Sequence, residues 1–124
     1  KNVMTISVLA VDDSRTMRDM ITLALKGDGF DLHLAEDGQH GLEVLQKLAP
    51  DVIITDINMP RLDGFGFIDA IRGRAASRHT PILVLTTESA DELKARARSA
   101  GATGWIVKPF AQDKLIRALR MVAG

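Results

Sequence analysis

Two short segments of the sequence, residues 52–55 and 82–85, consist almost entirely of consecutive apolar or β-branched residues. A strand with one face in water alternates polar and apolar residues, whereas a continuous apolar run is typical of a strand buried on both faces. Burial on both faces calls for a layer of helices on each side of the sheet. These two segments therefore favour an α/β fold with a sheet at its centre.

The rest of the chain alternates between predicted strands and predicted helices. Three further apolar runs, residues 6–11, 32–35 and 105–107, read as strands. The segments between and after the runs carry apolar residues three or four positions apart, as amphipathic helices do. Their stripes lie within residues 17–25, 42–48, 67–71, 93–100 and 115–122. The alternation predicts a five-stranded parallel sheet, doubly wound as (βα)5, in a single domain spanning residues 1–124 with no effector domain.

The fourth predicted helix has the clearest end signals. Ser89 and Glu92 stand three residues apart, as in a capping box, and Gly101 follows where a helix often ends. The apolar stripe of this helix is mostly alanine, so it buries little area. We therefore expect this helix to be the most easily moved.

Composition excludes several classes of function. The chain has 16 basic and 16 acidic residues, which argues against a protein that coats nucleic acid or binds membranes, so neither is expected as a partner. It has no cysteine, which excludes disulfides and thiolate metal sites. The N-terminal segment KNVMTISVLAVDD lacks a signal-peptide cleavage pattern, and we expect a cytoplasmic protein.

Polar residues directly follow four of the five predicted strands. Asp12 and Asp13 follow the first, Asp56 the third, Thr86 the fourth and Lys108 the fifth. Each alone has an ordinary explanation as a helix cap, a turn residue or a solvated charge. Because ligands of such sheets bind beyond the carboxyl ends of the strands, their joint occurrence indicates a functional site at one edge of the sheet.

Three adjacent carboxylates repel one another and call for a cation. With no cysteine and no suitably spaced histidine, the oxygen ligands favour a hard ion such as Mg²⁺, which also accepts phosphate oxygens. Phosphoryl transfer needs a nucleophile and charge neutralisation on the phosphoryl oxygens. Asp56 is the candidate nucleophile, since aspartate forms acyl phosphates. Lys108 and the Thr86 hydroxyl are candidates for contacting the phosphoryl oxygens.

Four motifs at these positions resemble those of a response-regulator receiver domain. They are VDDS at 11–14, D-x-N-M-P at 56–60 with D-G at 63–64, TTE at 86–88 and KPF at 108–110, and the resemblance covers essentially the whole chain. The chain looks most like the single-domain chemotaxis response regulators. The resemblance implies a flavodoxin-like strand order of 2-1-3-4-5.

The resemblance also implies a role for each matching residue. Asp56 is then the phosphoacceptor, and Lys108, before a cis Pro109, assists it. Mg²⁺ is then held by the carboxylates of Asp12, Asp13 and Asp56 and by the backbone carbonyl of Asn58. Thr86 and Trp105 are then the switch residues. Asn58 and Glu88 then tune hydrolysis of the aspartyl phosphate.

Two positions depart from the family pattern. Trp105 stands where the family usually has Tyr or Phe, and the larger indole calls full inward rotation of this side chain into question. Ala111 follows KPF where the family often has Ser or Thr, so the fifth helix lacks a side-chain cap.

The partners implied are a histidine kinase and, as output, a flagellar motor switch protein, bound by the surface of the fourth helix, fifth strand and fifth helix. The protein is expected to be a monomer that catalyses only its own phosphorylation and dephosphorylation. The region of Met17 and Met20 is the expected kinase-docking surface. Basic residues are expected to line the output surface: Lys94, Arg96, Arg98, Lys114, Arg117 and Arg120.

Other functions compete with this interpretation. A flavin-binding module would need a loop rich in Ser, Thr and Gly after the first strand, where Asp12 and Asp13 stand. An aspartyl phosphatase would have a D-x-D motif there. Within the receiver family, the chain is alternatively a phosphate sink, a phosphorelay intermediate or a receiver cut from a longer transcription factor.

Overall fold

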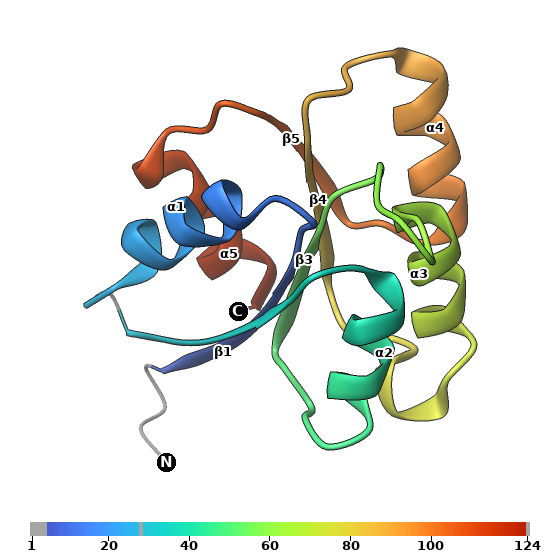
Figure 1. The fold of residues 1–124 in the computed structure, drawn as a ribbon, viewed down its shortest axis with the longest axis horizontal. Coiled ribbons are helices and arrows are strands. Elements are labelled where there is room, and N and C mark those ends of the chain that lie inside the picture. Colours follow the sequence, from blue (N-terminus) through green and yellow to red (C-terminus); the bar gives the residue numbers. More distant parts are fainter. Residues whose placement is uncertain (1–4, 28, 124) are drawn as a thin grey trace.

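A computed structural model describes residues 5–27 and 29–123, so the KNVM start of the N-terminal segment lies outside the described residues. Strands and helices alternate along the chain, as predicted (Figure 1). The strands are β1 Ile6–Val11, β2 Phe30–Ala35, β3 Val52–Thr55, β4 Ile82–Thr86 and β5 Gly104–Val107. The helices are α1 Arg15–Leu25, α2 Gly38–Leu45, α3 Gly64–Arg72, α4 Asp91–Ala100 and α5 Gln112–Ala123, with a short 3-10 helix at Ala75–Ser77. Among the described helices, none has the length and apolar character to cross a membrane.

The five strands form one parallel sheet in the order β2-β1-β3-β4-β5, which confirms the predicted fold. Helices α1 and α5 cover one face, and α2, α3 and α4 cover the other (Figure 1). The edge strand β2 begins two residues earlier than predicted. Its Asp31 is exposed, and a polar residue at that position broke the apolar run by which the strand was identified.

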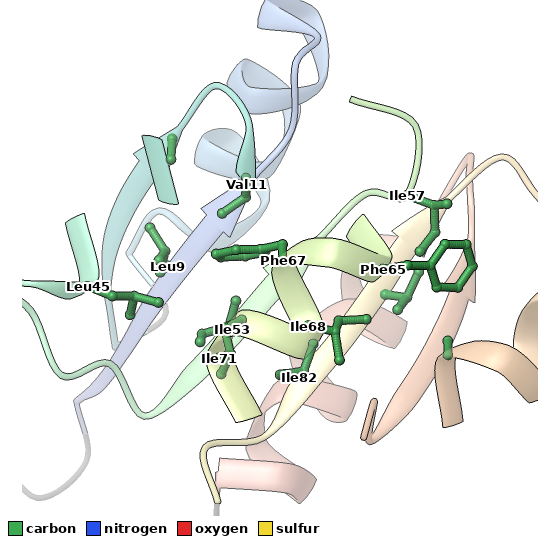
Figure 2. Close-up of a cluster of buried hydrophobic side chains, with 13 residues drawn as sticks. Leu9, Val11, Leu45, Ile53, Ile57, Phe65, Phe67, Ile68, Ile71 and Ile82 are labelled. Atoms are coloured by element: carbon green, nitrogen blue, oxygen red, sulfur yellow. The ribbon is translucent and has the colours of Figure 1, made fainter. Parts of the chain in front are cut away.

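Two hydrophobic cores lie on the two faces of the sheet. Ile53 of β3 points into the core under α2, α3 and α4, whereas Val52 and Ile54 point into the core under α1 and α5. All three residues are at most 1% exposed, as expected of a strand covered on both sides. Figure 2 shows the first core, in which the ring of Phe67 lies between β1 and α3.

Helix α4 is held unevenly along its length. Its N-cap is Ala90, and no described side chain caps it, so the capping box predicted at Ser89 is wrong. The amides of Leu93 and Lys94 bond to the Ala90 carbonyl, which starts the helix one residue later than that motif requires. At the other end, Gly101 has a φ of +115° and ends the helix as predicted. The Gly101 carbonyl accepts two hydrogen bonds from the Arg72 guanidinium, at 3.1 and 2.8 Å.

Candidate functional site

The three predicted carboxylates lie together at the carboxyl ends of β1 and β3. Oxygen atoms of Asp12, Asp13 and Asp56 all lie within 4.8 Å of one another. Asp12 and Asp56 are 2% and 8% exposed, whereas Asp13 is exposed. Asp12 and Asp13 could instead have capped the following helix. In the structure the N-cap of α1 is Ser14, whose hydroxyl oxygen accepts from the Met17 amide at 3.2 Å.

Lys108 bridges the two buried carboxylates. Its Nζ donates to Oδ2 of Asp12 at 2.7 Å and to Oδ2 of Asp56 at 2.9 Å, and its side chain is only 9% exposed. The Lys108–Pro109 peptide bond is cis, as expected. Lys108 thus brings the end of β5 to the ends of β1 and β3, although these residues lie 52 or more positions apart in the sequence.

Burial and pairing oppose each other in the pKa values of this cluster. Burial raises the pKa of Asp12 above its usual 3.8, and the hydrogen bond from Lys108 offsets this only in part. Burial lowers the pKa of Lys108, but the hydrogen bonds to Asp12 and Asp56 outweigh it, so this pKa is raised above 10.5. When ionised, the three carboxylates carry more negative charge than the single ammonium group of Lys108 neutralises.

This donor set fits a hard divalent cation. It offers two buried carboxylates and one exposed carboxylate, and all the ligand atoms are oxygens. Mg²⁺ is typically bound by one or two carboxylates, with water and phosphate oxygens completing its shell. The excess negative charge favours such an ion, because close carboxylates without a cation repel one another.

Both oxygens of Asp56 are engaged, and α3 packs directly behind this residue. Oδ1 accepts from the Ile57 amide at 2.6 Å, and Oδ2 accepts from Lys108. A Cβ atom on Gly64, the first residue of α3, would overlap the Asp56 carbonyl oxygen and lie 2.7 Å from the Ile57 Cα. Only a residue without a side chain allows α3 to start this close to Asp56.

Glu88 connects the other predicted residues across the mouth of the site. Its carboxylate accepts from Asn58 Nδ2 at 2.9 Å, and its carbonyl accepts from Trp105 Nε1 at 3.0 Å. The Glu88 amide donates to Oγ1 of Thr86 over a long 3.4 Å. Trp105 is half-buried on the α4 side of the sheet. The loops after β3 and β4 and strand β5 therefore meet at this one glutamate.

The basic residues predicted to line one surface point in several directions. Arg96 lies over the Phe65 ring of α3, 3.9 Å from its centroid, and Arg120 lies 5.1 Å from the ring centroid of Phe30 in β2. Arg117 pairs with Asp113 of its own helix at 3.2 Å. Lys94 and Arg98 line one hollow together with Trp105, the predicted switch aromatic. Arg96 and Arg120 therefore point away from the predicted surface, and the expectation for the other four residues stays a prediction.

Two arginines near the site were missed from the sequence. Arg18 of α1 donates to the Asp12 carbonyl at 2.8 Å, and Arg61, in the loop after β3, bonds to Asp37. Arg18 lies six residues from Asp12, so a search of the first turns after each strand would have found it. The Arg61 contact joins two loops 24 residues apart and leaves no local signal.

Comparison with known proteins identifies the family. The family model of the response regulator receiver domain matches residues 8–120. The response regulator MprA of Mycobacterium tuberculosis H37Rv is 34% identical over 117 residues, which cover 94% of this chain and 50% of MprA. The chain therefore spans about half the length of the curated relatives it matches.

Solved structures show the same fold. The Vibrio cholerae chemotaxis protein CheY4 has a TM-score of 0.91 and 44% identity over 95% of this chain and 98% of that protein. The receiver domain of the sensor histidine kinase PA1611 from Pseudomonas aeruginosa PAO1 has a TM-score of 0.89 and 27% identity over 97% of this chain and 98% of that domain. That structure carries a magnesium ion coordinated in its active-site cleft.

Proposed function

Because the chain belongs to the response regulator receiver domain family, we propose that it accepts a phosphoryl group from a histidine kinase onto Asp56 and signals through a surface that changes on phosphorylation. The observation that carries this proposal is the pairing of Lys108 with Asp12 and Asp56 at 2.7 and 2.9 Å beside a third carboxylate. Such a cluster presents a buried carboxylate nucleophile, a buried ammonium group and a site for a hard ion at the carboxyl ends of β1, β3 and β5.

The transfer is a displacement at phosphorus. A carboxylate oxygen of Asp56 attacks the phosphorus of the kinase phosphohistidine, the new P–O bond forms, and the P–N bond breaks with its electron pair leaving on the imidazole nitrogen. The Ile57 amide holds Oδ1 of Asp56 and fixes the orientation of the carboxylate. The Lys108 ammonium, which now donates to Oδ2 of Asp56, then donates to an oxygen of the bound phosphoryl group.

The ion expected at the site is Mg²⁺, held by the carboxylates of Asp12, Asp13 and Asp56 and by the backbone carbonyl of Asn58. When bound, it neutralises charge on the carboxylates and on the incoming phosphoryl group. The acidic cluster of this chain and the magnesium-bound receiver domain of PA1611 support this assignment.

The residues around Glu88 carry the signal outward. The Thr86 hydroxyl, whose present bond to the Glu88 amide is long, turns to donate to a phosphoryl oxygen. That movement pulls on the loop from which Glu88 binds Trp105 and Asn58. The Asn58–Glu88 pair at the mouth of the site controls how water reaches the aspartyl phosphate and thereby sets its lifetime.

Two surfaces serve the two partners. The kinase docks on α1, where Met20 is 40% and Leu23 is 71% exposed beside a hollow of about 280 Å³ that Phe110 also lines. The output partner binds at α4, β5 and α5, where Lys94 and Arg98 favour acidic groups and Trp105 favours apolar ones.

The similarity to the chemotaxis protein CheY4 supports a flagellar motor switch protein as the output partner. On this proposal, the protein acts in the cytoplasm as a monomer and binds no DNA by itself. The similarity to half of MprA supports the alternative of a receiver within a longer regulator. A phosphate sink or relay receiver would share the site without the output surface. A binding experiment separates motor control from the other possibilities. If the output partner is a motor switch protein, the phosphorylated wild type binds it and the Lys94→Glu variant does not.

The first test measures the intact mass after incubation with Mg²⁺ and acetyl phosphate, a small phosphodonor, and after incubation with a histidine kinase and ATP. We expect one added phosphoryl group on the wild type and none on Asp56→Asn. A gain on both proteins would refute Asp56 as the acceptor. No gain on the wild type from either donor would refute the proposed function.

A further inference from the structure

The loop between β3 and α3 contains a turn centred on an arginine in an unfavourable backbone conformation. Arg61 has a φ of +65°, and the Leu62 amide donates to the Pro60 carbonyl at 2.7 Å. A hydrogen bond from an amide to the carbonyl two residues earlier, with a positive φ at the residue between them, defines a γ-turn of the rare, strained kind. Glycine adopts this region freely, whereas an arginine requires interactions that hold it there.

The side chain of Arg61 supplies those interactions. Its Nε donates to Oδ2 of Asp37 at 2.7 Å, and its Nη2 donates to Oδ1 at 3.0 Å, an arrangement of two parallel bonds that fixes orientation. The Asp37 side chain is 7% exposed and also caps α2, accepting from the His40 amide at 2.9 Å. The hydrogen bond from Arg61 lowers the pKa of Asp37 below its usual 3.8.

Backbone hydrogen bonds tie the same loop at both ends. The Gly64 amide donates to the Ile57 carbonyl at 2.8 Å and closes the loop on itself. The Gly38 amide, at the start of α2, donates to the Leu62 carbonyl at 3.2 Å. Ile57 in turn holds Oδ1 of Asp56. Asn58 therefore lies in a short closed loop whose two fixed points are the Asp56 carboxylate and the Arg61–Asp37 pair.

We propose that Arg61 is a positioning residue of the phosphorylation site, and that its pairing with Asp37 selects the loop conformation in which the Asn58 carbonyl and the Asp56 carboxylate face the cation. The inference rests on the proposed function for its assignment of the Mg²⁺ site. Exposed ion pairs usually contribute little to stability. This pair is different because it joins a buried carboxylate to a backbone conformation that the arginine would not adopt alone.

Two variants and a matched control test the proposal. Asp37→Asn removes the charge while keeping a residue that caps helices well. Arg61→Gly removes the pair and the backbone strain together. The control is Asp113→Asn, which breaks an exposed pair on α5. The Mg²⁺ affinity is measured from the amide chemical shifts of Ile57 and Asn58 during titration of each folded protein with Mg²⁺.

We expect Asp37→Asn to weaken Mg²⁺ binding about tenfold, the size typical of losing an outer-shell partner of a metal site. Arg61→Gly should weaken it less, because glycine adopts a positive φ without the pair. The double variant should bind Mg²⁺ as Arg61→Gly does and more tightly than Asp37→Asn, because glycine at position 61 no longer needs the pair. Amide hydrogen exchange of Leu62 should quicken in the two variants. Asp113→Asn should match the wild type in both measurements.

Unchanged Mg²⁺ affinity in both variants would overturn the proposal. If the Leu62 amide exchanged faster while the affinity stayed the same, the pair would be only structural, and this result too would overturn the proposal. A wild type that binds no Mg²⁺ would overturn it as well. A wild type that binds Mg²⁺ but gains no phosphoryl group would refute the proposed function alone, and the affinities of the variants would still decide the role of Arg61.

Discussion

The substitution Gly64→Ala tests how closely α3 must approach Asp56, the proposed phosphoacceptor. The added Cβ would overlap the Asp56 carbonyl oxygen, lie 2.7 Å from the Ile57 Cα and lie 3.0 Å from the Asp56 carbonyl carbon. All three are backbone atoms, which cannot rotate away as a side chain can. The start of α3 must therefore shift or the end of β3 must bend.

The expected cost follows from two opposing effects. Overpacking a rigid site typically costs 1 to 3 kcal/mol, and contacts with backbone put Gly64→Ala at the upper end, about 3 kcal/mol. Alanine in place of glycine in a helix returns up to about 1 kcal/mol. The net loss in the free energy of unfolding is then about 2 kcal/mol, a large part of the 5 to 15 kcal/mol typical of a domain.

Gly73, at the other end of the same helix, provides the matched control. A Cβ there would lie 3.5 Å from the nearest atom, the Asp69 carbonyl oxygen, and the backbone φ is −78°. Gly73→Ala should leave stability unchanged or raise it by up to about 1 kcal/mol.

The assay is urea unfolding followed by the fluorescence of Trp105, the single tryptophan of the chain, without divalent ions. We expect the two alanine variants to differ by about 2 to 3 kcal/mol. If their stabilities agree within about 0.5 kcal/mol, the size of an ordinary surface substitution, the reasoning from close approach is refuted.

Three further predictions concern charged residues. The pKa of Asp37 is lowered by the hydrogen bond from its arginine partner, so its contribution to stability is present above pH 3.8 and is lost as the pH falls through the lower, folded-state pKa. Urea unfolding should therefore find the wild type more stable than Asp37→Asn near neutral pH but equal to it in strong acid. Arg96→Ala should lose about 0.5 to 1 kcal/mol by removing the contact with Phe65, whereas Arg98→Ala should lose less; equal losses would contradict the assignment. Lys108→Met leaves two buried carboxylates without their partner and should lose about 3 kcal/mol near neutral pH without divalent ions, and an unchanged midpoint in urea would contradict this.

The central strands could be predicted because their environment leaves a strong local pattern. β3 and β4 are covered on both faces, so each of their positions must be apolar or pair its polar group within the protein. β2 lies at an edge, where Asp31 reaches water, and its first residues therefore escaped the pattern. The start of α4 was misplaced by one residue because the capping motif at Ser89 is a short-range pattern, and in the structure Ala90 takes the cap position without a side-chain hydrogen bond.

The site was predictable for a different reason. The ends of parallel strands converge, so Asp12, Asp56 and Lys108 could be placed together from their positions in the sequence alone. The contacts of Glu88 with Trp105 and of Arg61 with Asp37 could not, because they depend on side-chain directions and on the meeting of two loops. Neither leaves a periodic or short-range pattern in the sequence.

The uneven attachment of α4 would let this helix tilt around the end that lies farther from the proposed phosphorylation site. At one end of α4, Arg72 donates two hydrogen bonds to the Gly101 carbonyl. At the other end the N-cap is Ala90, and none of the described side chains caps the helix there. A helix of 10 residues is about 15 Å long. A tilt of about 10° around the Arg72 end would therefore carry the Ala90 end through roughly 2.6 Å while the far end stays in place. A small displacement of the loop that holds Glu88 would thus change the tilt of α4, with the largest shift at the end nearest Asp56, where the proposed output surface would present it to a partner.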